Sequence, residues 1–571
     1  MINLPGGRQV RNADQARGAA GYVTGRGSPR RRWAGLVFIS LGVAMIIVDA
    51  TIVNVAIPQI IKDLHITATD AQWIQDTYTL VFAALLLVAG RLADRVGRRR
   101  MFLTGIVIFM AASTSAALAG SGTALIASRI VQGVGGAMIL PTSLSLVNAG
   151  FRGKERGIAF AVWGSTIGGT AALGPLLGGW LTTSFSWRWA FGINIPLGAV
   201  VIVGLLMLVP ESRGDQTERG NDLIGALLTV IGLTGVVFAL IEGRTDGWWT
   251  RIAPVRLLGM TMTSSLSPVP VAALIGVASL VIFVCYERRR NRQGKAVLLD
   301  LRLFAIPSFR NGNIAVAIVS LGEFGILFAL PLWLENVIGL SAFETGLILL
   351  PLAVGSFAAS GLGAALAARR GPLLVVRIGI LLELLGVLSI GLVVTPSTAA
   401  WELVVPLFGY GMGVGLATAQ LTGVVLADVP VELSGQGSGT QSTARQIGSA
   451  LGIAILGTIL FTTLAARLHG ELRSIGVPPQ ANSAIVTAVQ DSGGATIPAL
   501  NARPRTAAAG HAAESAFSTA TRWSAFSAAG FLLLGLAASM SLGPSRRPGD
   551  DAADRPGNGD YAPADERAAR D

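Results

Sequence analysis

Four charged side chains lie inside long apolar stretches of this sequence. Asp49 and Arg129 are deep in two of these stretches, Glu323 is near the middle of a third, and Asp76 is in the outer third of a fourth. A charged side chain at the centre of a bilayer costs about 2.5–3.5 kcal/mol, so it is retained where it faces a cavity or a partner. The chemistry open to such residues is proton binding or, alternatively, a permanent salt bridge between helices.

A compact charged loop, Gly90–Arg100, connects two of the apolar stretches; we call it the latch loop. Glycine at its first position and at Gly97 allows two helix ends to approach closely. Asp94 is placed to pair with an arginine or with a helix N-terminus in a contact that can break. Its arginines, Arg98 and Arg99 among them, favour the cytoplasmic side of a membrane. We interpret this loop as a gate.

The composition places these residues in membrane-spanning helices. Apolar residues make up 52% of the chain and charged residues 13%, against about 25% charged in soluble domains, and the mean hydropathy is +0.62. A span of roughly 20 residues predicts fourteen helices in an all-α membrane protein. They are expected near 33–57, 72–93, 101–120, 123–149, 158–183, 188–209, 222–242, 269–286, 309–334, 344–368, 372–394, 401–427, 439–465 and 522–542.

The helix count divides the chain. We expect one six-helix half over 33–209, two inserted helices over 222–286 and a second half over 309–542. Residues 1–32 and 543–571 are polar and are predicted to be disordered cytoplasmic tails. The Ala/Ser/Pro-rich segment 466–521 is predicted to be a long external loop, either functional or without fixed structure.

The net charge of +12 favours anionic membrane lipid as a partner rather than nucleic acid. Most basic residues fall on one side of the predicted helices, which places both termini in the cytoplasm and the chain in the plasma membrane. Cys285 is the single cysteine and the three histidines are scattered, so no disulfide or metal site is expected. There is no phosphate-binding loop and no nucleophile–base pair. We therefore predict no enzyme and no cofactor, with the proton gradient as the energy source.

Several motifs carry a family resemblance. The latch loop resembles the loop between the second and third helices of major facilitator superfamily transporters. Four further runs resemble motifs of its fourteen-helix drug:proton antiporter branch: Asp49–Pro58, Arg129–Gly136, Gly164–Gly179 and Trp187–Pro196. The resemblance implies the major facilitator fold, two six-helix halves plus two inserted helices. The second half matches less well, because Gly361–Gly371 echoes the latch loop without its aspartate.

The resemblance also implies roles for the charged residues. The first and fourth helices of each half of such transporters line a central cavity, so Asp49, Arg129 and Glu323 are expected to face one aqueous cleft and, with Asp76, to couple protons. An acid at position 76 is similar to one in exporters of quaternary-ammonium compounds. Glu383 is ranked below Glu323 because its helix is usually peripheral.

Other residues are assigned to the cavity wall and to helix packing. Glu323, Phe324, Phe328 and Gln132 are expected in the substrate cavity, where the two rings offer cation–π contact. Arg445 is expected to snorkel near a helix end. In the fifth helix, small residues spaced for close backbone contact, with a proline that bends the helix, form the antiporter motif: Gly164, Gly168, Gly174, Pro175, Gly178 and Gly179.

The sequence thus predicts a proton-coupled antiporter that exports amphipathic, in one version cationic, small molecules from the cytoplasm. A first alternative is a dedicated exporter of one native metabolite, antibiotic or lipid. A second, of another class, is a membrane sensor or scaffold that transports nothing.

Overall fold

The computed structural model describes residues 28–66, 68–171, 173–214, 222–243, 247–250, 256–257, 260–261 and 267–543. The tails predicted to be disordered lie outside these residues, except at their inner ends. There the prediction was wrong for 29–32, because the first helix already begins at Pro29, where the Ser28 hydroxyl accepts a hydrogen bond from the Arg31 N–H. Serine before proline is a common way to start a helix, since proline there has no N–H to leave unpaired.

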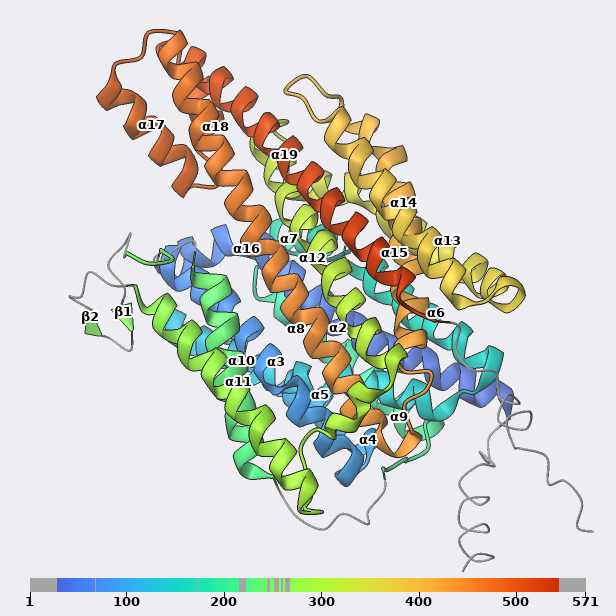
Figure 1. Ribbon diagram of the computed structural model, residues 1–571. Coiled ribbons are helices and arrows are strands. Elements are labelled where there is room, and N and C mark those ends of the chain that lie inside the picture. The colour runs from blue at the N-terminus through green and yellow to red at the C-terminus, as the bar shows by residue number, and fades with distance from the viewer. Residues whose placement is uncertain are drawn as a thin grey trace, which may run out of the picture.

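The described chain is almost entirely helical (Figure 1). The first half consists of α2 (Pro29–Leu64), α3 (Ala68–Val96), α4 (Arg98–Ala117), α5 (Gly122–Gly150), α6 (Gly153–Ala171), α7 (Leu173–Ser184), α8 (Trp189–Gly192) and α9 (Asn194–Leu208). The inserted pair is α10 (Leu223–Glu242) and α11 (Pro268–Arg292), with two short antiparallel strands between them, β1 (Arg256–Leu257) and β2 (Met260–Thr261). Within the described residues, these strands are the departure from the all-α chain that the sequence predicts.

The second half begins after a short 3₁₀ helix, η1 (Leu301–Ala305). Its elements are α12 (Pro307–Asn336), α13 (Ala342–Arg370), α14 (Pro372–Val393), η2 (Ala400–Leu403), α15 (Val404–Val425), η3 (Val431–Leu433), α16 (Ser434–Ser474), α17 (Pro479–Asp491), α18 (Ile497–Asn501) and α19 (Ala507–Met540).

Twelve helical segments of the described residues are long and apolar enough to cross a bilayer. They coincide with twelve of the fourteen segments predicted from the sequence. The other two predicted segments, 72–93 and 158–183, fall on α3 and on α6 with α7. The structure therefore supports a multi-pass helical bundle, in which twelve of the described segments have the length and composition of a span.

The segment 466–521, predicted to be a loop, is largely helical, so that prediction was wrong. Helix α16 continues to Ser474, and α17, α18 and the start of α19 follow. Leu468 and Leu472 lie four residues apart and are both fully buried, which is the spacing of one helix face. Alanine, whose abundance suggested a loop, is also the residue with the highest helix propensity.

The two halves meet along a few helix pairs. On one side of this interface, α3 and α5 pack against α16. On the other side, α6 and α7 pack against α13, and α6 also packs against α15. Helices α10 and α11 lie side by side at the edge of the bundle, where α10 contacts α3 and α16 (Figure 1). The inserted pair thus lies beside one seam between the halves.

Candidate functional site

A buried ion pair forms the centre of the first half. Asp49 of α2 accepts a hydrogen bond of 2.5 Å at its Oδ2 from Nη1 of Arg129 on α5. Both side chains are completely buried. Taking two charges out of water is costly unless further hydrogen bonds satisfy them, so the surroundings of this pair decide what it can do.

Polar side chains of α5 itself, α4 and α9 complete this network. Asp49 Oδ1 also accepts from the amides of Gln132 (3.2 Å) and Asn194 (2.7 Å). Both amides reach the hydroxyl of Ser113 on α4, at 2.7 and 3.2 Å. Gln132 therefore belongs to this network and is itself fully buried. We call these five residues the Asp49 network: Asp49, Ser113, Arg129, Gln132 and Asn194.

An aromatic ring covers the guanidinium of Arg129. The Arg129 Cζ lies 4.1 Å from the centre of the Tyr78 ring, and Nε donates to the carbonyl oxygen of Ile74 at 3.1 Å. Tyr78, Ser113 and Asn194 were not singled out in the sequence. Asn194 lies in the Trp187–Pro196 motif, whereas Ser113 carries no local signal because its partners are remote in sequence.

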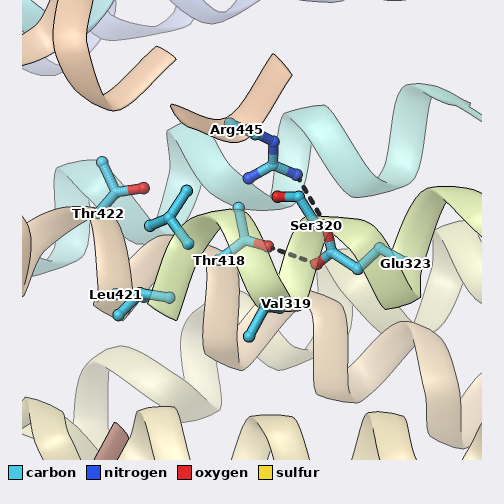
Figure 2. Close-up of a pocket in the computed structure, with 8 residues that line it drawn as sticks. Val319, Ser320, Glu323, Thr418, Leu421, Thr422 and Arg445 are labelled. Carbon is cyan, nitrogen blue, oxygen red and sulfur yellow. Dashed lines mark hydrogen bonds and ion pairs between the residues drawn. The ribbon is translucent and has the colours of Figure 1, made fainter. Parts of the chain in front are cut away.

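The second half has its own buried pair. Nη2 of Arg445 on α16 donates to Oε2 of Glu323 on α12 at 3.2 Å, and the hydroxyl of Thr418 on α15 donates to Oε1 at 3.1 Å (Figure 2). The side chains of Glu323 and Arg445 are 3% and 13% exposed. The two charges line a small cavity of about 10 Å³ together with apolar and hydroxyl side chains: Val316, Val319, Ser320, Thr418, Leu421 and Thr422. It has room for about one water molecule.

This arrangement corrects the role predicted for Arg445. Its guanidinium does not snorkel to a helix end but pairs with Glu323, which is 122 residues away in sequence. Its Cζ also lies 5.8 Å from the ring of Phe324, so an internal cation already occupies the neighbourhood of that ring. Phe328, one turn further along α12, is half-buried and lies close to Gly457 of α16.

The sequence placed Asp49, Arg129 and Glu323 in one cleft. Among the described residues, no hydrogen bond or ion pair joins Glu323 to the Asp49 network; the structure has one buried network in each half. Asp76 is half-buried on α3, two residues beyond Ile74, whose carbonyl holds Arg129.

The latch loop contacts the second half directly. Oδ1 of Asp94 accepts from Nη2 of Arg98 (2.8 Å) and from the N–H of Gly435 (2.9 Å), and Oδ2 accepts from the N–H of Gln436 (3.1 Å). The first N–H groups of a helix lack partners within it and carry partial positive charge. Asp94 therefore binds both an arginine and the N-terminus of α16. Arg98 also donates to the carbonyl oxygen of Val431 at 2.6 Å.

Two glycines of the latch loop are required by close packing. A Cβ at Gly90 would overlap the carbonyl oxygen of Gly435 on α16. Gly97 has a φ of +119°, and a Cβ there would lie 2.7 Å from Cδ of Glu211. Glu211 accepts from the backbone N–H of Arg99 at 3.0 Å and so caps the start of α4. This role was not predicted from the sequence.

The glycines of the predicted antiporter motif pack on two sides. A Cβ at Gly174 or Gly178 would meet Thr51 or Ile52 of α2, in the same half. A Cβ at Gly164 would lie 2.7 Å from Cα of Ala419 on α15, and one at Gly179 would lie 3.0 Å from Phe343 of α13. These small residues let the two halves touch. Gly168 and Pro175 lie in α6 and α7, and their surroundings are outside the described part of the structure.

The candidate spans make this chain a multi-pass membrane protein, and comparison with known proteins gives its family. The sequence matches the Major Facilitator Superfamily over residues 39–453. The chain belongs to this superfamily.

Its relatives are similar over most of their length. It is 36% identical over 463 residues to the probable actinorhodin transporter of Streptomyces coelicolor, covering 79% of this chain and 76% of that one. It is 34% identical over 447 residues to the multidrug resistance protein Stp of Mycobacterium tuberculosis, covering 78% and 79%. The human organic anion transporter MFSD10 has a similar fold, with a TM-score of 0.54, 14% identity and coverage of 90% and 100%.

Proposed function

We propose that this protein is a proton-coupled antiporter that exports amphipathic small molecules. The observation that carries the proposal is the ion pair between Asp49 and Arg129, which is completely buried at the meeting point of several helices. Protonation of Asp49 would remove the charge that holds Arg129, and the freed guanidinium would have to find another partner. A proton bound at this point can therefore change how α2 and α5 pack, which is what coupling to movement of the halves needs.

The membrane arrangement is part of the proposal. We take α3 and the pair α6–α7 as two further spans, which gives fourteen with the twelve described above. The end of the bundle with the latch loop would face the cytoplasm, because Arg99, Arg100 and the exposed Arg288 and Arg289 of α11 gather basic charge there. Anionic lipid headgroups are the expected contacts of those arginines.

The names of the relatives guide the choice of cargo. One is named for multidrug resistance and another for transport of actinorhodin. Broad export of amphipathic drugs and dedicated export of one metabolite are therefore the two candidates. A panel of dyes and antibiotics separates them, since protection against many compounds supports the first and protection against a single compound the second.

Efflux from vesicles tests the proposal. Inside-out membrane vesicles containing the protein are loaded with a pH gradient, and uptake of ethidium and of a neutral amphipathic dye is followed by fluorescence. We expect uptake that stops when an uncoupler collapses the gradient. Uptake that persists without the gradient would exclude proton coupling, and a lack of uptake across the whole panel would favour the sensor or scaffold alternative.

A further inference from the structure

The second half contains a buried carboxyl group that the two networks do not use. Glu383 lies in the middle of α14 and is completely buried. Among the residues that the structure describes, neither of its carboxylate oxygens has a hydrogen-bond partner. A buried carboxylate with no donor to either oxygen is far more costly than a buried carboxylic acid.

The backbone of α15 covers this side chain. A Cβ at Gly413 would lie 2.7 Å from Cγ of Glu383, so glycine at this position is what makes room for the acid. One turn earlier on α15, Tyr410 is also buried, and its hydroxyl donates to the backbone carbonyl of Glu323 at 3.2 Å. Helix α15 thus lies against Glu383 and also hydrogen-bonds to Glu323.

The charges around Glu383 do not balance if it is ionised. Glu323 and Arg445 both lie within electrostatic range of it, and their mutual ion pair already uses the one buried guanidinium described there. Two carboxylates beside one arginine would leave a net negative charge in an apolar interior, and such pairs of acids retain a proton.

Other titratable groups on the elements packed against α14 are engaged or remote. On α19, Arg522 donates to the carbonyl oxygen of Gly391 at 3.2 Å. The ionisable side chains of η2 and α13 are exposed at helix ends: Glu402, Glu344, Arg369 and Arg370. On α14 itself, Arg377 donates to the carbonyl of Ser539.

We propose that Glu383 is a proton-binding site of the second half and that it carries its proton in this conformation, while Glu323 is ionised and paired with Arg445. The inference rests on the proposed function for its role in transport, because a proton held here would be exchanged when the Glu323–Arg445 pair rearranges. If Arg445 moves from Glu323 to Glu383, the proton of Glu383 passes to Glu323 and the charge of the cluster is unchanged.

Infrared spectroscopy of the purified full-length protein in lipid nanodiscs, without cargo, tests the assignment. A protonated carboxyl has a carbonyl stretch that an ionised one lacks. We expect this band at neutral pH in the wild type, its loss in Glu383→Gln, and a shifted band in Glu383→Asp. The matched control is Glu402→Gln, where a glutamine oxygen can still accept the hydrogen bond that the Ala399 N–H donates, and the band should be unchanged.

Removing the arginine gives a second, independent readout. In Arg445→Gln, Glu323 loses its counter-charge, so a second protonated carboxyl should add to the band. A band that is the same in Glu383→Gln as in the wild type, or no added intensity in Arg445→Gln, would overturn the proposal. Neither experiment needs transport, so this failure is distinct from a failure of the vesicle assay.

Discussion

Two acidic residues of α2 show how surroundings decide the role of a carboxylate. Asp49 is completely buried and receives three side-chain hydrogen bonds. Asp63 lies beyond the apolar part of the helix, and hydrogen bonds from Trp187 and Arg188 hold its pKa below the usual value. The Asp63–Arg188 pair is 49% and 40% exposed, and pairs of that kind contribute little to stability. Only the buried pair is expected to change the packing of helices when it is protonated.

Asp49→Asn should abolish proton-driven efflux while the protein still inserts. The amide keeps an oxygen acceptor, but it cannot bind and release a proton, and Arg129 loses its counter-charge. Breaking a buried pair costs about 3–5 kcal/mol when the partner charge is left unpaired, so a lower thermal stability is also expected. Efflux from vesicles and thermal unfolding in detergent measure both effects.

The control for Asp49→Asn is Asp63→Asn, on the same helix but in an exposed pair. It should retain efflux close to that of the wild type. Full efflux by well-expressed Asp49→Asn would remove Asp49 from the coupling mechanism.

Glu323→Gln tests whether the cargo is cationic. Glu323 is neutralised by Arg445 in this conformation, so a cation can use it only after that pair opens. If it does, transport of permanently cationic dyes should fall, whereas transport of neutral substrates should be almost unaffected. Competition assays with the two classes of dye measure this. An equal loss for both classes would mean that Glu323 does not bind cationic cargo and serves helix packing or proton transfer instead.

At the scale of elements, the seam between α3 and α16 depends on backbone contact. Asp94 holds the N-terminus of α16, and glycines at 90 and 435 let the two helices touch. Gln436 extends this contact to the inserted pair, because its Oε1 accepts from the N–H of Asp300 at 2.7 Å, in the segment that follows α11. Movement at this seam would therefore be transmitted to the inserted helices.

Gly435→Ala should separate α3 from α16. The new Cβ would lie 2.5 Å from Cγ of Asp94 and would overlap the carbonyl oxygen of Gly90. Overpacking of this kind costs about 1–3 kcal/mol, which would disfavour this conformation. We expect faster hydrogen–deuterium exchange over residues 430–440.

Gly470→Ala is the matched control, because it lies on the same helix and a Cβ there would meet nothing within 4 Å. Equal hydrogen–deuterium exchange over residues 430–440 in both variants would mean that glycine at position 435 is not what lets α3 and α16 touch.

Asp94→Ala should impair switching more than binding. The substitution removes the acceptor for Arg98 and for two N–H groups of α16, and Asp94 belongs to neither of the two buried networks. The rate at which dye exchanges across the vesicle membrane should change, while the affinity of the protein for the dye is retained. Lost affinity with unchanged exchange would contradict the gating role.

At the scale of the whole molecule, the two halves meet where α3 and α5 pack against α16, where α6 and α7 pack against α13, and where α6 packs against α15. In the proposed arrangement of fourteen spans, both termini would lie in the cytoplasm and α17 would lie outside. A fluorescent protein fused to the C-terminus should therefore fluoresce, and alkaline phosphatase inserted at residues 476–478, between α16 and α17, should be active. If the inserted phosphatase is inactive although the protein is well expressed, this end of the bundle faces the cytoplasm.

Much of the fold could be predicted from local sequence. Apolar length sets where a helix can cross a membrane, so the predicted segments coincide with helices. The latch loop and the Arg129 and Trp187 motifs led to the superfamily that the comparison confirms. Asp94 was expected to meet an arginine or a helix N-terminus, and it meets both.

Tertiary structure decided what depends on partners remote in sequence. Arg445 reads as an ordinary interfacial arginine until Glu323, 122 residues away, is placed beside it. Ser113 and Glu211 became site residues only because other helices bring an amide or an N–H group to them. The helices in 466–521 were missed because their stability comes from burial of Leu468, Leu472 and Val489, and burial against other elements is a property of the packed molecule, not of the local sequence.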